Sequence, residues 1–198
     1  MKRLVIYIHG KGGNAREAEH YKPLFKDCDV IGFDYKSQTP WEAKTEFSRF
    51  LDVNCTDYGS VYLIANSIGA FFAMNADFDG RIEKAFFISP IVDMEILIVD
   101  MMKQSGIAEE ELAAAGEMTT DFGETLSWKY LCYVRENPIR WNVPTHILYG
   151  GKDCLTAMDT ITGFADKTDS KLTVMKDGEH WFHTDEQMHF LDDWIKNP

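Results

Sequence analysis

The sequence lacks a hydrophobic run long enough to cross a membrane. A spanning helix needs about 20 consecutive apolar residues. The longest candidate, Ile91–Met102, is interrupted by Asp93, Glu95 and Asp100. The first apolar run, Leu4–Ile8, is too short for the core of a signal peptide, and no cleavage site follows it. We therefore expect a soluble cytoplasmic protein that does not bind membranes.

Positive charge is also scarce. The chain has 20 Lys and Arg residues against 32 Asp and Glu residues, which gives a formal net charge of −12. The basic residues form no cluster along the sequence. Nucleic acids and anionic membrane surfaces attract basic patches, so we expect neither as a partner.

Cysteine is sparse, and its spacing gives no sign of a disulfide framework or a zinc site. The four cysteines lie far apart, and none belongs to a CxxC motif. In a chain without an expected export signal, such cysteines are reduced thiols. They are Cys28, Cys55, Cys132 and Cys154.

What the sequence does have is an alternation of apolar strand-length runs with helical patterns. With 198 residues, 45% of them hydrophobic, the chain is long enough for one domain with a sizeable core. Alternation of this kind predicts an α/β fold with a mostly parallel sheet of about six strands, covered on both faces. The expected strands are Leu4–Ile8, Val30–Phe33, Val61–Ile64, Ala85–Ile88, His146–Tyr149 and Leu172–Met175.

Several helices have recognisable starts. Thr39-Pro40-Trp41-Glu42 has the pattern of a capping box with proline at the first helical position, and Thr184–Gln187 has the pattern of a second capping box. Ala15–Phe25 is typical of a helix disturbed by Pro23.

The segment from about 94 to 137 breaks the alternation. It predicts two helices, around Met94–Gln104 and Ala108–Ala115, and contains no clear strand that continues the alternation. We interpret it as an insertion whose methionines and aromatics first form its own core. A second interpretation is an adaptable apolar lid, with Met101 and Met102 contacting an acyl group of the substrate.

The stretch Ala65-Asn66-Ser67-Ile68-Gly69 lies between an expected strand and an expected helix. A tight turn there strains the serine backbone and projects its Oγ from the carboxyl edge of the sheet. Small residues are needed two positions before and after the serine because strand and helix nearly collide. The alternative is that Ser67 is an ordinary helix-capping serine. Motifs elsewhere in the chain are needed to distinguish the two interpretations.

Three other strand ends carry chemically suggestive groups: His9-Gly10-Lys11-Gly12-Gly13, Asp153 and His180. A serine hydroxyl is a poor nucleophile until a base such as imidazole removes its proton. The imidazole in turn needs a carboxylate to hold its tautomer. Ser67, Asp153 and His180 occur in the chain order that one hydrolase fold requires.

Together, these motifs resemble those of the α/β-hydrolase superfamily over nearly the whole chain. The resembling segments are His9–Gly13, the turn at Ser67, Tyr149–Asp153 and Gly178–His180. The chain is similar to a compact member that lacks the first two strands of larger relatives. The resemblance implies a three-layer α/β-hydrolase fold with a small helical cap.

The resemblance also implies roles for individual residues. Ser67 would be the nucleophile, His180 the base and Asp153 its orienting acid. The backbone N–H groups of Lys11 and Ile68 would form the oxyanion hole. Expected substrate-binding residues are Gly10, Gly12, Asn66, Met101, Met102 and Trp181.

Two departures from the family pattern matter. Ala65 replaces the usual glycine, which a small side chain should tolerate. Asn66 stands where esterases often have histidine, so the substrate class does not transfer.

The residues leave alternatives open. Asp153 could cap a helix, with Asp93 as the substitute acid, and His183 could replace His180 as the base. His9 is expected to be structural, and Cys154 to be a packed small residue. His180, His183 and Asp185 lack a second cluster of ligands, so we expect no metal.

These patterns predict a serine hydrolase, an esterase-like enzyme without a cofactor. It would cleave a carboxylic ester or related acyl bond of a small molecule through an acyl-enzyme. A peptidase or thioesterase with the same triad is an alternative, as is a ligand-binding protein without turnover. The sequence predicts neither the substrate nor the oligomeric state.

Overall fold

The computed structural model describes residues 2–76 and 80–197. The chain divides into two compact units, one formed by Met1–Val92 with Arg140–Pro198 and the other by Asp93–Ile139. In the part of the chain that is described, no helix is long and apolar enough to cross a membrane.

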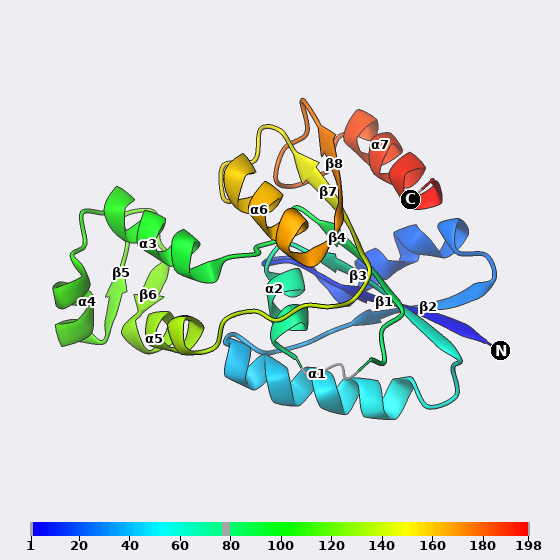
Figure 1. Cartoon of the computed structure of the whole chain (residues 1–198), viewed down its shortest axis with the longest axis horizontal. Coiled ribbons are helices and arrows are strands. Elements are labelled where there is room, and N and C mark those ends of the chain that lie inside the picture. The colour runs from blue at the N-terminus through cyan, green and yellow to red at the C-terminus, as the bar shows by residue number, and fades with distance from the viewer. Residues whose placement is uncertain (1, 77–79, 198) are drawn as a thin grey trace. The chain divides into compact units, whose positions relative to one another are not determined.

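The first unit is built on a parallel sheet of six strands in the order β2-β1-β3-β4-β7-β8 (Figure 1). All five strand pairs are parallel, and the prediction of an α/β sheet of about six strands is confirmed. The strands are β1 (Arg3–Ile8), β2 (Cys28–Phe33), β3 (Ser60–Asn66), β4 (Lys84–Ile88), β7 (Thr145–Gly150) and β8 (Lys171–Met175).

Burial explains why the sequence of β1 is apolar throughout. Its residues Leu4–Ile8 are all at most 1% exposed, because neighbouring strands pair with both of its edges and helices cover both faces. The register of this pairing places Ile8 beside Phe33 on one side and Ala65 on the other. The carboxyl ends of these three strands therefore lie at one edge of the sheet.

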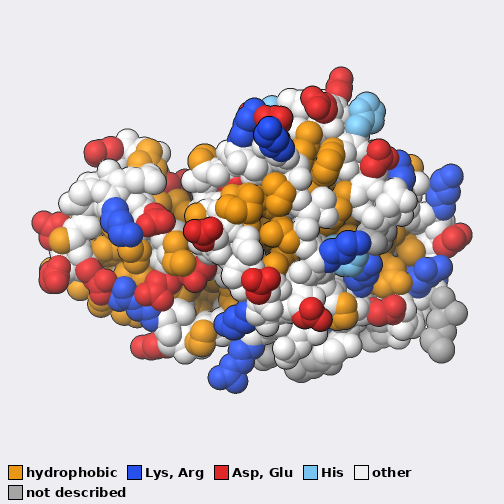
Figure 2. Space-filling view, turned by 45° about the horizontal axis from the view of Figure 1, so that its top comes forward, with side chains coloured by type: hydrophobic (Ala, Val, Ile, Leu, Met, Phe, Trp, Pro, Cys, Tyr) orange, Lys and Arg blue, Asp and Glu red, His pale blue; other side chains and the backbone are white. Residues whose placement is uncertain are grey.

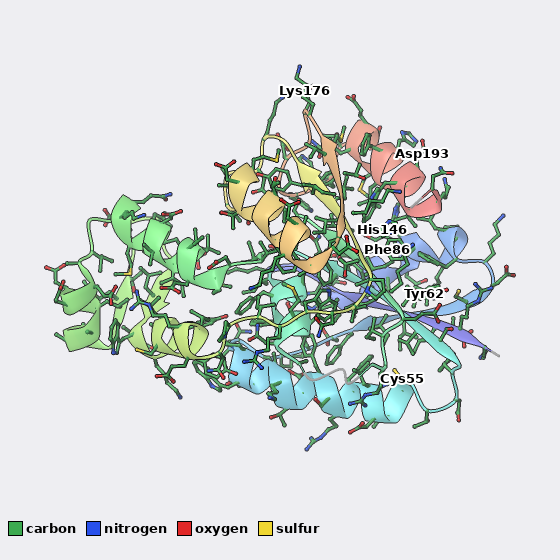
Figure 3. The ribbon with its side chains drawn as sticks, in the orientation of Figure 1. Cys55, Tyr62, Phe86, His146, Lys176 and Asp193 are labelled. Atoms are coloured by element: carbon green, nitrogen blue, oxygen red, sulfur yellow. The ribbon has the colours of Figure 1, made fainter. Side chains whose placement is uncertain are left out.

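Helices cover the two faces of this sheet. The 3₁₀ helix η1 (Ala15–Leu24) and helix α7 (Asp185–Lys196) share one apolar cluster with the sheet. In that cluster Phe86 contacts Trp194 edge-to-face, with ring centroids 5.8 Å apart (Phe86 is labelled in Figure 3). On the other face, α1 (Pro40–Asn54) packs on α2 (Ile68–Asn75), and α6 (Met158–Thr168) precedes β8.

The predicted capping box at the start of α1 is present in full. The Thr39 hydroxyl accepts the N–H of Glu42, and the Glu42 carboxylate accepts the N–H of Thr39. At α7 the prediction is half right. The Thr184 hydroxyl accepts the Gln187 N–H, but the Gln187 side chain accepts the N–H of His183 instead.

The second unit contains α3 (Met94–Gln104), α4 (Glu109–Ala115), the antiparallel strands β5 (Glu117–Thr119) and β6 (Thr125–Ser127), and α5 (Trp128–Glu136). The two helices match the predicted ranges. Within residues 2–76 and 80–197, strands β5 and β6 pair only with each other and do not continue the parallel sheet. They and α5 were not expected from the sequence. Ion pairs from the Arg135 guanidinium to Glu95 and Glu109 connect α5 to the other two helices.

The surface carries the acidic excess of the sequence. On the face shown in Figure 2, Asp and Glu side chains occur on both units, with Lys and Arg side chains interspersed among them.

Candidate active site

The turn between β3 and α2 holds Ser67 in an unusual backbone conformation. Its φ is 51° and its ψ is −122°, in a region that residues other than glycine rarely adopt. The Ser67 N–H donates to the carbonyl of Ile88, and the Ser67 carbonyl accepts from the N–H of Ile91. The end of β4 and the segment that follows it therefore hold the strained residue through its backbone.

Glycines allow the loop after β1 to contact this turn. A Cβ atom at Gly69 would lie 2.4 Å from the carbonyl oxygen of His9, and one at Gly10 would lie 3.1 Å from the Cβ of Ser67. Ala65 is fully buried. Small residues are required here because the loop, the strand and the helix approach one another closely.

Ser67, His180 and Asp153 form a chain of hydrogen bonds. Ser67 Oγ lies 2.8 Å from His180 Nε2, and His180 Nδ1 lies 2.7 Å from Asp153 Oδ2. The Asp153 side chain is fully buried. An ionised carboxylate only accepts hydrogen bonds, so Nδ1 carries the proton and Nε2 presents a lone pair to the serine hydroxyl. This arrangement can remove the serine proton.

Asp153 also caps the turn that follows it. Its Oδ1 accepts the N–H groups of Leu155 and Thr156, at 2.8 and 3.3 Å. The capping alternative and the contact with His180 are therefore compatible, because each uses a different oxygen. Asp93, the substitute acid considered from sequence, caps α3 by accepting the N–H of Ile96.

The loops that carry Asp153 and His180 are packed against each other through glycines. A Cβ atom at Gly150 would lie 2.5 Å from the carbonyl of Glu179, and one at Gly151 would lie 2.4 Å from that of Lys176. The Lys152 N–H donates to the carbonyl of Gly178. These contacts fix the acid and the imidazole relative to each other.

The side chain of Tyr149 bonds to the segment that follows Asp153. Burial, and then the Asp153 charge, raise the pKa of its hydroxyl. It therefore stays protonated and donates to the carbonyl of Thr156 at 2.6 Å. This bond fastens the segment whose N–H groups hold Asp153.

His183 takes a different position. Its Nδ1 bonds to the carbonyl of Trp181, and its ring stacks on that of Trp181 with centroids 4.7 Å apart. The Ser67 hydroxyl bonds to His180 instead. Among the described residues, no group of three or more His, Cys, Asp and Glu side chains is arranged to hold a metal ion.

His9 lies in the loop after β1 but makes structural contacts. Its Nδ1 lies 2.8 Å from the carbonyl of Gly10, and its ring stacks on Tyr35 at 4.3 Å. The Tyr35 hydroxyl donates to the His9 carbonyl. Sequence analysis expected a structural His9 but did not single out Tyr35.

The backbone of the proposed oxyanion hole comes from two loops. Lys11 lies in a turn closed by the N–H of Gly13 donating to the carbonyl of Gly10, with Gly12 at φ 78°. Ile68 is the first residue of α2, and the first N–H groups of a helix have no acceptor within it. The role of both N–H groups in binding an oxyanion stays a prediction.

The other predicted substrate-binding residues fall in two places. Gly10 and Gly12 lie in the loop after β1. Asn66 ends β3 directly before Ser67, and Trp181 follows His180 and is 69% exposed. Met101 and Met102 lie on α3 in the second unit. Their contact with a substrate stays a prediction.

Tyr7 and Glu17, which lie beside the loop after β1, were not singled out from the sequence. The Tyr7 hydroxyl donates to Glu17, and Glu17 accepts the N–H of Asn14. One signal was available, because Asn14 followed three residues later by Glu17 is a capping-box pattern.

Comparisons with known proteins agree with this architecture. No protein-family model and no curated protein matches the chain. Among solved structures, alpha/beta hydrolase domain-containing protein 10 from mouse has a TM-score of 0.78 at 18% identity, covering 98% of this chain and 88% of that one. Est1E from Butyrivibrio proteoclasticus has a TM-score of 0.76 at 16% identity, covering 99% and 86%.

A soluble variant of monoglyceride lipase from Saccharomyces cerevisiae, in complex with a substrate analog, is also similar. Its TM-score is 0.67 at 14% identity, covering 100% of this chain and 86% of that one. Similarity at this level of identity concerns the fold rather than the activity. With its parallel six-stranded sheet and its strained serine turn at the end of β3, the chain has the α/β-hydrolase fold.

Proposed function

We propose that this protein is a serine hydrolase that cleaves a carboxylic ester of a small molecule. The observation that carries the proposal is the hydrogen-bonded chain from Ser67 Oγ through the His180 ring to the buried Asp153 carboxylate. A hydroxyl, an imidazole and a carboxylate in this order are the groups that nucleophilic acyl transfer requires.

In the first half of the reaction, Nε2 of His180 takes the Ser67 proton while Oγ attacks the ester carbonyl carbon. The carbonyl oxygen becomes an oxyanion, which the N–H groups of Lys11 and Ile68 stabilise. Asp153 stabilises the imidazolium. The tetrahedral intermediate then collapses, the C–O bond to the alcohol breaks, and the imidazolium donates its proton to the leaving oxygen.

In the second half, water replaces the alcohol. His180 takes a proton from the water, whose oxygen attacks the acyl-enzyme carbonyl and forms a second oxyanion at the same site. Collapse of this intermediate returns the proton to Ser67 Oγ and releases the carboxylic acid. The chain's own residues perform every proton transfer.

The names of the structural neighbours support an ester as the substrate. They include a monoglyceride lipase and an esterase from Pyrococcus furiosus. Because one fold supports many acyl-transfer reactions, thioesters and peptides are tested as alternatives. A panel of p-nitrophenyl esters of graded chain length, with aminoacyl p-nitroanilides and acyl thioesters, compares the three classes by kcat/KM.

The nucleophile is tested with Ser67→Ala. We expect kcat on the best p-nitrophenyl ester to fall by about three orders of magnitude or more, with an unchanged far-UV spectrum. A fluorophosphonate should add its mass to Ser67 of the wild type. Activity within about tenfold of wild type, or label on another residue, contradicts the assignment.

The two histidines form a matched pair for testing the base. His180→Ala should reduce kcat about as strongly as Ser67→Ala, because the two residues act as a unit. His183→Ala should leave kcat within a few-fold, since His183 bonds to Trp181 rather than to Ser67. The reverse pattern would transfer the role of base to His183. A wild type that takes no label and turns over no substrate would favour a ligand-binding protein.

A further inference from the structure

Two polar side chains beside the proposed site take no part in the mechanism above. Tyr7 lies on β1 and is 1% exposed, and its hydroxyl donates to Glu17 Oε2 at 2.5 Å. Burial, and then the neighbouring Tyr21 and Glu17, raise the pKa of the Tyr7 hydroxyl. Tyr7 therefore stays protonated and keeps this bond over the working pH range.

The other oxygen of Glu17 holds the loop after β1. Glu17 Oε1 accepts the N–H of Asn14 at 3.0 Å. It also lies against Gly13, where an added Cβ atom would be only 2.8 Å from it. The carboxylate thus fixes the far end of the Gly10–Asn14 loop, the loop that contains Lys11.

The Tyr7 hydroxyl also lies near the residue that precedes Ser67. The side chain of Asn66 lowers the pKa of Tyr7 against the larger raising effects of burial, Tyr21 and Glu17. Strand pairing explains this proximity, because Tyr7 lies beside Ile64 and alternation puts Asn66 on the same face as Ile64. The Tyr7 hydroxyl therefore anchors Glu17, and with it the loop after β1, to the sheet beside the strand that leads into Ser67.

We propose that Tyr7 and Glu17 are positioning residues that fix the separation of the two oxyanion donors. This inference rests on the proposed function. The Lys11 N–H belongs to the loop that Glu17 holds, and the Ile68 N–H lies just beyond the end of β3, the strand that pairs with Tyr7. Oxyanion donors act only when they point at the place where the charge develops. A connection that sets their spacing therefore acts on the transition state.

The experiment uses the full chain and compares kcat with KM on one p-nitrophenyl ester. Tyr7→Phe and Glu17→Ala each remove the hydrogen bond between Tyr7 and Glu17. We expect kcat to fall about 10- to 100-fold, less than the loss of a whole donor, with KM within about threefold. KM is spared because the ground-state carbonyl gains much less from these donors than the oxyanion does.

Two further variants separate positioning from stability. Tyr58→Phe is the matched control, because the Tyr58 hydroxyl donates to Asp29 Oδ2 at 2.6 Å near the opposite, amino end of β2. It removes the same kind of bond and should leave kcat within about twofold. Glu17→Gln keeps an acceptor for the Asn14 N–H and should recover most of the kcat that Glu17→Ala loses.

A second measurement is the rate at which a fluorophosphonate labels Ser67, since its phosphoryl oxygen uses the same donors without turnover. Tyr7→Phe and Glu17→Ala should be labelled at least about tenfold more slowly than wild type. Labelling and kcat no lower than in Tyr58→Phe, or a rise in KM alone, overturn the inference and leave the proposed function standing. A wild type that neither takes label nor hydrolyses esters removes the proposed function, and this inference with it.

Discussion

Ser67 occupies a backbone conformation that its side chain disfavours. At φ 51°, the Cβ atom of any L-residue is crowded by its own backbone, at a cost of about 1–3 kcal/mol. Hydrogen bonds from Ile91 and to Ile88 keep the residue there. Such strain persists only where the surrounding structure imposes it, and here it directs Oγ toward His180.

This strain predicts that Ser67→Gly is more stable than Ser67→Ala. Both variants lose the hydroxyl and its bond to His180, but only glycine adopts positive φ without steric cost. The more flexible unfolded chain offsets about 0.4–1 kcal/mol of the gain. The thermal midpoint of Ser67→Gly should therefore exceed that of Ser67→Ala by a few degrees in calorimetry. An equal or higher midpoint for Ser67→Ala would show that position 67 stores no strain.

Among individual residues, Ser67, Asp153 and His180 were chosen from the sequence as candidate catalytic residues. The structure joins them by hydrogen bonds. Chain order, the flanking glycines and the resemblance to the α/β-hydrolase superfamily led to this selection, because such a fold places strand ends along one edge. Tyr7 was not selected, since a tyrosine within an apolar strand run has the pattern of any core aromatic. Its importance depends on Asn66 and Glu17, which only the folded sheet brings to it.

At the scale of elements, the long apolar strands were predictable and the short pieces were not. Strands buried on both faces have continuous apolar sequences, as in β1. The three-residue strands β5 and β6 are too short for alternation to be detected. Helix α5 was missed because Ser127 makes no side-chain capping bond and only Leu131 and Val134 on it are buried. Its aromatic residues obscure the helical period.

His146 lies near the amino end of β7, between Lys84 at the start of β4 and Lys171 at the start of β8. His146 of β7 pairs with Phe86 of β4 and Lys171 of β8, and its ring lies 5.9 Å from that of Phe86 (Figure 3). Burial, then Lys84, then Lys171 lower its pKa from 6.5 to about 4. In the described part of the chain, its Nδ1 is buried without a hydrogen-bond partner.

This environment predicts that His146 destabilises the fold in acid. Between pH 6.5 and about pH 4 the unfolded chain binds a proton at His146 and the folded chain does not. The free energy of unfolding therefore decreases as the pH is lowered through that window, and His146 does not affect it above the window. In His146→Gln, the thermal midpoint should decrease less from pH 7.5 to 4.5 than in wild type. Parallel curves for the two proteins would contradict the lowered pKa.

At the scale of the whole molecule, the sheet and the candidate site belong to one of the two units. Ser67, Asp153 and His180 lie in the first unit, which the chain leaves after Val92 and re-enters at Arg140. The second unit has its own ion pairs from Arg135 and its own buried leucines, Leu112, Leu126 and Leu131.

We predict that the first unit folds without the second. Replacing Asp93–Ile139 by a Gly/Ser linker of about ten residues, which can reach about 30 Å, should preserve the far-UV spectrum and fluorophosphonate labelling of Ser67. A linker of twice that length controls for strain at the junction. Loss of folding with both linkers would contradict the prediction.

The same deletion tests the predicted substrate contacts of Met101 and Met102. If they bind an acyl chain, the order of preference among p-nitrophenyl esters of different length should change when they are removed. An unchanged order would show that this prediction was wrong.

The separation of Ser67 from His180 along the chain has a consequence for biosynthesis. The two residues are 113 positions apart, so at about 5–20 residues per second the ribosome makes His180 roughly 6–23 s after Ser67. Throughout that interval the nascent serine lacks the His180 imidazole, and a serine hydroxyl without its base is a poor nucleophile. Under the proposed function, a chain that stops before His180 would therefore be inactive toward esters, and hydrolysis would begin only after the loop beyond β8 has been made.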